Sequence, residues 1–116
     1  MDVTGTIRDY YAALEDGEAL YPFFREDPAT VKFGISEALV GYEAVAAGLR
    51  EQTRTTTDWV AESRDLTVGT AWFADDVFLA WTDTDRGIRY EFDTRWSGSL
   101  VDGEFAAVHV SVATEL

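Results

Sequence analysis

The stretch IRYEFDTRWSGSLVDGEFAAVHVSVAT (residues 88–114) decides the fold, because it has the pattern of a long β-hairpin. Polar residues alternate with aromatic and β-branched ones on both sides of Asp102-Gly103, and Asp-Gly is a strong signal for a two-residue turn. Counting back from that turn places Trp96 opposite His109. This register predicts which side chains share a face of the sheet.

The two-residue period extends upstream as far as Thr55, which predicts a meander of strands before the hairpin. Turns are expected at Asp75-Asp76 and at Arg86-Gly87. Strands are predicted near residues 57–62, 66–73, 77–84, 88–97 and 104–114.

The N-terminal half has a helical period instead. A first helix, capped by Asp2 or Thr4, ends at Gly17, and a second begins at Gly41. A short helix around Pro22 and a short strand over residues 31–34 lie between them. Their apolar stripes are Ile7, Tyr10, Tyr11 and Leu14 in the first helix, and Tyr42, Val45, Ala46 and Leu49 in the second.

Helices followed by a meander predict an α+β fold, in which helices cover one face of an antiparallel sheet. A chain of 116 residues has the length of one domain, which we place over residues 1–116. The face toward the helices is expected to carry Val68, Thr70, Trp72, Leu79, Trp81, Asp83, Tyr90, Phe92, Thr94, Trp96, His109 and Ser111. The other face is predicted to carry Arg89, Glu91, Asp93 and Arg95 beside Phe78, Val108, Val110 and Val112, which suits solvent over one part and a partner subunit over another.

The composition is strongly acidic, with 22 acidic residues against 9 basic ones and a net charge of −13. This charge repels phosphates, so nucleic acid and anionic membranes are not expected as partners. Lys32 is the only lysine. A high content of acidic residues with so little lysine resembles the composition of haloarchaeal proteins, which stay soluble in concentrated salt. An ordinary acidic protein is the alternative.

The chain has no cysteine, which excludes disulfides and thiolate metal sites and suits a reducing cytoplasm. Its first residues lack the pattern of a signal peptide, and no apolar run is long enough to span a membrane. We therefore expect a cytoplasmic location. One histidine and no His/carboxylate cluster predict that no metal binds, and no cofactor motif is present.

Two titratable residues are candidates for proton transfer. His109 is the only histidine, and its imidazole could act as a general acid or base in a pocket. Its alternative role is a buried neutral ring that is hydrogen-bonded to a neighbour. Asp83 could be a buried carboxylate with a raised pKa, or a solvated residue at a strand end.

Aromatic side chains are numerous for this length, with 4 tryptophans among them. Indoles that wall a pocket would bind flat, apolar ligands, whereas the alternative is that they fill the core. The predicted ligand-binding residues are Tyr11, Trp59, Trp72, Trp81, Tyr90, Trp96 and His109.

Several segments, in this order, resemble the SnoaL-like branch of the nuclear-transport-factor-2-like superfamily. They are residues 7–17 (IRDYYAALEDG), 31–34 (VKFG) with 41–45 (GYEAV), 77–81 (VFLAW) and 95–111, which contains the Asp102-Gly103 turn and Val108-His109-Val110-Ser111. The resemblance implies a cone-shaped, cystatin-like sheet closed by N-terminal helices. It also implies a pocket at the wide end and a homodimer through the outer face of the sheet.

The superfamily includes ketosteroid isomerase, cyclases, dehydratases and non-enzymatic modules, so the fold alone selects none of these functions. Tyr11 matches the position of the oxyanion-hole tyrosine of the isomerase. The isomerase base falls near Phe33-Gly34, where this chain has no carboxylate. Three functions stay open: binding of a small apolar molecule, isomerase- or cyclase-type catalysis with His109 or Asp83 and Tyr11, and a dimerisation or protein-interaction module.

Overall fold

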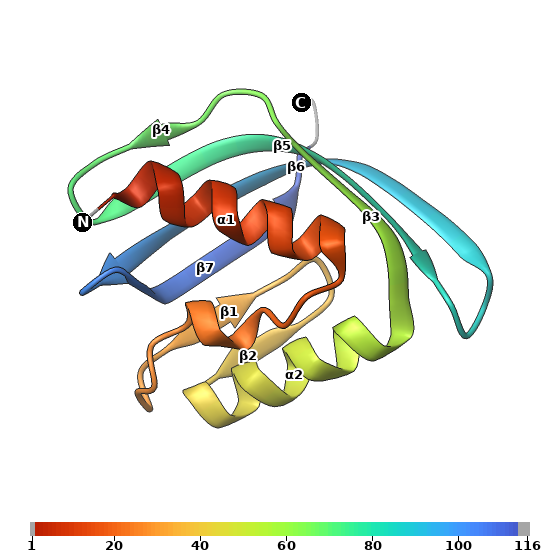
Figure 1. Cartoon of the computed structure of the whole chain (residues 1–116), viewed down its shortest axis with the longest axis horizontal. Coiled ribbons are helices and arrows are strands. Elements are labelled where there is room, and N and C mark those ends of the chain that lie inside the picture. Colours follow the sequence, from red (N-terminus) through yellow and green to blue (C-terminus); the bar gives the residue numbers. More distant parts are fainter. Residues whose placement is uncertain (1, 114–116) are drawn as a thin grey trace.

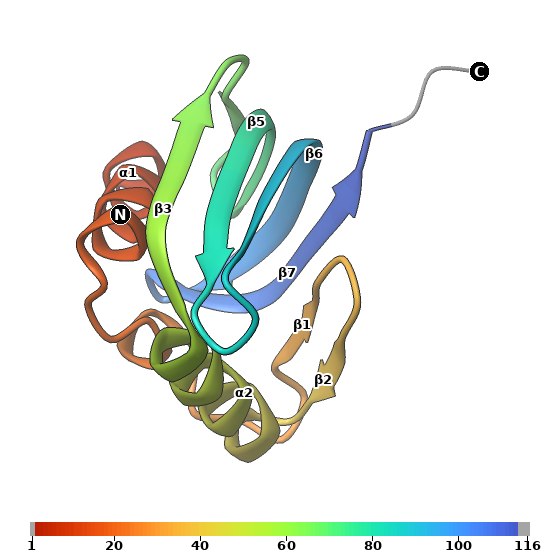
Figure 2. The same cartoon turned by 90° about the vertical axis from the view of Figure 1, so that its right-hand side faces the viewer.

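Two layers form the molecule in a computed structural model, which describes residues 2–113. One layer is a seven-stranded sheet in the order β2-β1-β7-β6-β5-β3, with β4 paired to β5. Helix α1 lies over this sheet (Figure 1) and α2 contacts β1, β2 and β3. Figure 2 shows the sheet curving from β3 round to β1 and β2. The predicted α+β class, with helices on one face of a curved sheet, is confirmed.

Helix α1 (Val3–Asp16) begins and ends where the sequence predicts. The Asp2 carboxylate caps it by accepting a hydrogen bond of 3.0 Å from the Gly5 N–H. Gly17 ends it in the left-handed conformation with φ of 71°, which glycine adopts without strain. The 3₁₀ helix η1 (Tyr21–Phe23) follows, with Pro22 in its first turn.

Helix α2 (Tyr42–Thr55) follows two short strands, β1 (Val31–Phe33) and β2 (Ala38–Val40). Its side chains Val45, Ala46 and Leu49 are buried, as the helical period predicts. The sequence pattern does not predict strand β2. It pairs with β1, which in turn pairs in parallel with β7.

The remaining strands are β3 (Thr56–Ser63), β4 (Thr67–Val68), β5 (Trp72–Asp83), β6 (Ile88–Val101) and β7 (Glu104–Val112). The predicted turn at Asp75-Asp76 is wrong, since both residues lie inside β5 and Asp75 pairs with Trp96. This correction moves Trp72 to the outer face, which we define as the face away from the helices, where it is 48% exposed. Residue 114 of the predicted last strand lies outside the described residues.

The loop between β5 and β6 is longer than the predicted Arg86-Gly87 turn. Asp83 pairs with Ile88, so the loop has four residues. Pairs between these strands therefore shift by two positions, which leaves the side chains of residues 78–83 and 88–96 on their predicted faces. Leu79, Trp81, Tyr90, Phe92, Thr94 and Trp96 accordingly share the inner face, toward the helices.

The closing hairpin has the predicted turn, because Val101 pairs with Glu104. Its register then shifts between Ser99 and Leu100, which leaves Ala106 as one extra residue on β7. Beyond this bulge, Trp96 pairs with Val110 and His109 pairs with Ser97. The predicted pairing of Trp96 with His109 is therefore wrong, and His109 and Ser111 lie on the outer face. Val108 and Val110, predicted to lie on the outer face, are buried in the core.

No helix within residues 2–113 is long and apolar enough to cross a membrane.

Candidate functional site

A cavity of about 350 Å³ lies on the inner face of the sheet, between α2 and the connection from β1 to β2. Strands β3, β5, β6 and β7, helix α1 and helix α2 all contribute to its wall. The lining side chains are mostly apolar, with a few polar ones gathered near β1 and at the end of α2. They are Tyr10, Leu14, Lys32, Ile35, Ser36, Glu37, Glu51, Gln52, Thr55, Thr56, Trp59, Leu79, Trp81, Trp96 and Val110.

Stacked rings form one wall of this cavity. The indoles of Trp59 and Trp81 have centroids 4.9 Å apart at an interplanar angle of 19°. The Tyr90 ring stacks at 5.4 Å from Trp81, and the Phe92 ring lies 5.7 Å from Trp81 and 6.3 Å from Tyr90. These rings are half-buried. A continuous aromatic surface of this kind suits contact with a flat molecule.

A bulge in β3 brings Trp59 to this wall. The pairing of β3 with β5 shifts between Thr57 and Val60, and Asp58 adopts a φ of 54°. Left-handed backbone is uncommon for residues other than glycine, although aspartate tolerates it better than most. The Trp59 indole N–H donates to the Thr56 hydroxyl at 2.8 Å, which holds the ring in place.

The polar end of the cavity contains Lys32 and Glu37. Lys32 is 5% exposed, and its ammonium forms an ion pair with the Glu37 carboxylate. Burial first, and then the Glu37 charge, raise the pKa of Tyr10 well above its ordinary value, because both disfavour the phenolate. The phenol of Tyr10 is thus a neutral hydroxyl at neutral pH. Neither Lys32 nor Glu37 is predicted as a site residue from the sequence, where the one available signal is a lone lysine on a predicted strand.

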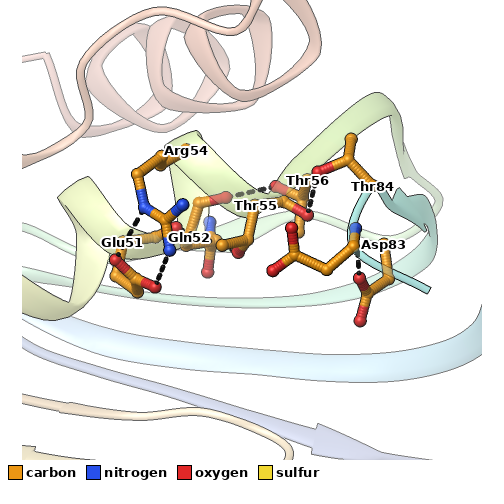
Figure 3. A network of polar contacts seen from close by, with 8 residues as sticks. Glu51, Gln52, Arg54, Thr55, Thr56, Asp83 and Thr84 are labelled. Carbon is orange, nitrogen blue, oxygen red and sulfur yellow. Dashed lines mark hydrogen bonds and ion pairs between the residues drawn. The ribbon is translucent and has the colours of Figure 1, made fainter. Parts of the chain in front are cut away.

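Figure 3 shows the network that joins the end of α2 to the β5–β6 loop beside the cavity. The Thr84 hydroxyl donates to the Thr55 carbonyl at 3.0 Å, and the Arg54 Nε donates to the Glu51 carboxylate at 3.1 Å. One Asp83 carboxylate oxygen accepts the N–H groups of Asp85 and Arg86 at 3.0 and 3.1 Å. Asp83 therefore organises the loop, and it does not line the cavity.

Tyr11 points to a different buried site. Its hydroxyl donates to the Asp75 carboxylate at 2.9 Å, and the same carboxylate accepts the Ser63 hydroxyl at 2.6 Å and the Asp65 N–H at 3.1 Å. Burial, followed by the charge of Asp75, raises the pKa of Tyr11. Tyr11 lies next to Trp96, at 5.3 Å between ring centroids, but does not line the cavity. The sequence pattern predicts a turn at Asp75, whereas the structure buries its side chain inside β5.

The predicted ligand-binding residues divide into three groups. Trp59, Trp81 and Trp96 line the cavity, and Tyr90 stacks on Trp81 without lining it. Tyr11 lies behind Trp96. Trp72 and His109 border a shallow groove on the outer face, with Val31, Phe33 and Ala107. His109 is exposed, and its ring centroid lies 6.0 Å from that of Phe33.

The described part of the chain contains no group of three or more His, Cys, Asp or Glu side chains arranged to hold a metal ion. The polar groups in the cavity are one ion pair, a phenol, several hydroxyls, the Glu51 carboxylate and the Gln52 amide. They can donate and accept hydrogen bonds at the end of a mostly apolar hollow.

Known structures share the fold of this chain over almost its whole length. A ketosteroid-isomerase-like protein from Catenulispora acidiphila, in complex with trimethylamine, has a TM-score of 0.75 and 9% identity over 93% of this chain and 85% of its own. A Mesorhizobium loti protein, provisionally described as a SnoaL-like polyketide cyclase, has a TM-score of 0.68 and 14% identity over 95% and 98%. TerC, co-crystallised with polyporic acid, has a TM-score of 0.72 and 12% identity over 95% and 90%.

The chain therefore has the ketosteroid-isomerase-like fold. The sequence matches no protein-family model and no curated protein. Identities this low establish the fold alone, because one fold of this kind carries many unrelated functions.

Proposed function

We propose that the chain binds a small, flat, largely apolar molecule in the cavity bordered by Trp59, Trp81 and Trp96. The observation that carries the proposal is the hollow of about 350 Å³, with stacked indoles along one wall and polar groups at one end. Such a combination is typical of small-molecule sites. Neighbours of the same fold that hold trimethylamine and polyporic acid support it, because they show ligands accommodated by this architecture.

Binding of the fluorescent apolar probe N-phenyl-1-naphthylamine tests the proposal. The native chain should bind the probe, and Trp81→Ala should weaken binding about tenfold because the central ring of the stack is lost. Trp72→Ala is the matched control, since that indole lies on the outer face. Equal affinity of Trp81→Ala and the native chain, or an equal loss in Trp72→Ala, would refute this site.

We further propose that two copies associate through the outer face of the sheet. Support comes from the apolar side chains Val31, Phe33, Trp72 and Ala107, which border one open groove on that face. Trp72 is 48% exposed, and burial of a large aromatic ring is a strong driving force for association. The cavity opens on the opposite face, so this association would leave it free.

We also propose that the chain works in a salt-rich cytoplasm. The net charge of −13 on 116 residues supports this, because concentrated salt screens the repulsion among carboxylates.

A further inference from the structure

The ion pair of Lys32 and Glu37 lies at the polar end of the cavity and has unused hydrogen-bonding capacity. A lysine ammonium has three donors. Within residues 2–113, Lys32 donates to a single side-chain acceptor, the Oε1 atom of Glu37. The other carboxylate oxygen of Glu37 accepts no hydrogen bond from a side chain among the same residues. One donor group and one acceptor group thus stand side by side on the cavity wall.

The local backbone is shaped to hold this pair. The Gly34 N–H donates to the Glu37 carbonyl at 3.0 Å and closes a tight connection between β1 and β2. A Cβ atom at Gly34 would lie 2.7 Å from Cγ of Glu37, so a larger residue there would push the Glu37 side chain from its place beside Lys32. Lys32 reaches the cavity because it pairs with Val108, whose side chain is buried on the inner face.

The charges around the cavity cancel or are negative. Glu37 neutralises Lys32, and the remaining carboxylate in the lining, Glu51, is bonded to Arg54. The whole chain carries −13, so its field opposes an anionic ligand. A cationic ligand finds no free counter-ion at this end of the cavity, because Glu37 is already paired with Lys32. The pair therefore favours an uncharged ligand.

We infer that Lys32 and Glu37 select an uncharged, planar ligand that carries an acceptor oxygen next to an N–H or O–H donor, such as a carboxamide. The oxygen accepts from Lys32, the donor group bonds to Glu37, and the ring lies against Trp59 and Trp81. This inference rests on the proposed binding function and names the chemical class that the same cavity takes.

Three probes of one size test it: 2-naphthamide, 2-acetonaphthone and 2-naphthoate. The amide presents a hydrogen-bond donor next to an acceptor, the ketone presents an acceptor alone, and the naphthoate is an anion. Calorimetric titration of the native chain should show the amide binding about tenfold tighter than the ketone, although the ketone is the more apolar compound. The anion should bind about tenfold weaker than the amide.

Glu37→Gln supplies the second measurement. It leaves Lys32 without a counter-ion, so naphthoate should gain affinity and bind tighter than naphthamide. The control Glu43→Gln makes the same charge change at an exposed position of α2 and should preserve the native order. The inference is overturned if the ketone binds as tightly as the amide, or if the probe affinities of Glu37→Gln keep the native order. In either case the cavity still binds a probe, so the proposed function stands. If none of the three probes binds, both the inference and the proposed function are overturned.

Discussion

Tyr10 and Tyr11 are neighbours on α1, yet their hydroxyls lie in different surroundings. Tyr10 lines the cavity near Glu37, whereas Tyr11 donates to Asp75 in the core. A helix turns about 100° per residue, which sends the two rings in different directions. Each hydroxyl is buried beside a carboxylate, and burial is the larger reason that the pKa of each is raised.

These raised pKa values predict a loss of stability at alkaline pH. In the unfolded chain a tyrosine loses its proton near pH 10. The folded chain holds the proton at that pH, so the contribution to stability is complete below about pH 10 and falls as the pH rises above it. The melting temperature of the native chain should therefore drop between pH 9 and pH 11.

Tyr10→Phe should make this alkaline drop smaller, because one of the two groups is removed. Tyr21→Phe, which deletes a hydroxyl from a half-buried ring, is the matched control and should leave the slope unchanged. If the melting temperature of Tyr10→Phe falls with pH as steeply as that of the native chain, the Tyr10 proton does not contribute to stability.

The hairpin of β6 and β7 decides what the inner face presents. Its bulge at Ala106 turns His109 outward and brings Val108 and Val110 inward. The chain has room for this bulge because residue 98 is glycine. A Cβ atom there would lie 2.2 Å from the Ala107 carbonyl oxygen and 2.8 Å from Cε1 of Phe73.

Gly98→Ala should therefore destabilise the chain by about 2 kcal/mol, because a backbone oxygen cannot move without opening the strand pairing. Chemical denaturation measures the change in the free energy of unfolding. Ser97→Ala, one residue away on the exposed outer face, should change it by less than about 0.5 kcal/mol. Equal stability of Gly98→Ala and the native chain would mean that the hairpin adjusts without cost.

At the scale of the whole molecule, the dominant property is the net charge of −13. The screening length is about 10 Å in 0.1 M salt and about 3 Å in 1 M salt. Carboxylates spread over a small surface therefore repel one another less in concentrated salt. We expect the melting temperature to rise steadily from 0.1 M to 2 M sodium chloride.

Two comparisons isolate the electrostatic part of that rise. Sucrose, which is uncharged, should raise the melting temperature less than the salt does. Tetramethylammonium chloride should act much like sodium chloride, because screening depends on ionic strength. A melting temperature that is independent of salt would contradict adaptation to a salt-rich environment.

Association through the outer face predicts a second whole-molecule property. Light scattering should give twice the chain mass of 12.9 kDa for the native protein and the single mass for Trp72→Glu. Ile88→Glu is the control, since Ile88 is 43% exposed at the β5–β6 loop, away from the groove. A monomeric native protein, or a dimer that persists in Trp72→Glu, would refute this interface.

The local patterns of the sequence determined both long helices, the change to strands near Thr55 and the Asp102-Gly103 turn. Each depends on residues close together in the chain: the cap at Asp2, the left-handed Gly17 and the alternation along residues 88–101. They also determined that Trp81, Tyr90 and Trp96 share one face, because a shift of two residues in a strand preserves that face.

Only the tertiary structure decided the positions of the polar side chains. Asp75 stays inside β5 because Tyr11 and Ser63, far away in the sequence, satisfy its carboxylate. The bulge at Ala106, and with it the outward position of His109, depends on contacts between strands. A single extra residue reverses every side chain beyond it, and no local pattern records whether that residue is present. The cavity and its Lys32–Glu37 pair follow from the same packing.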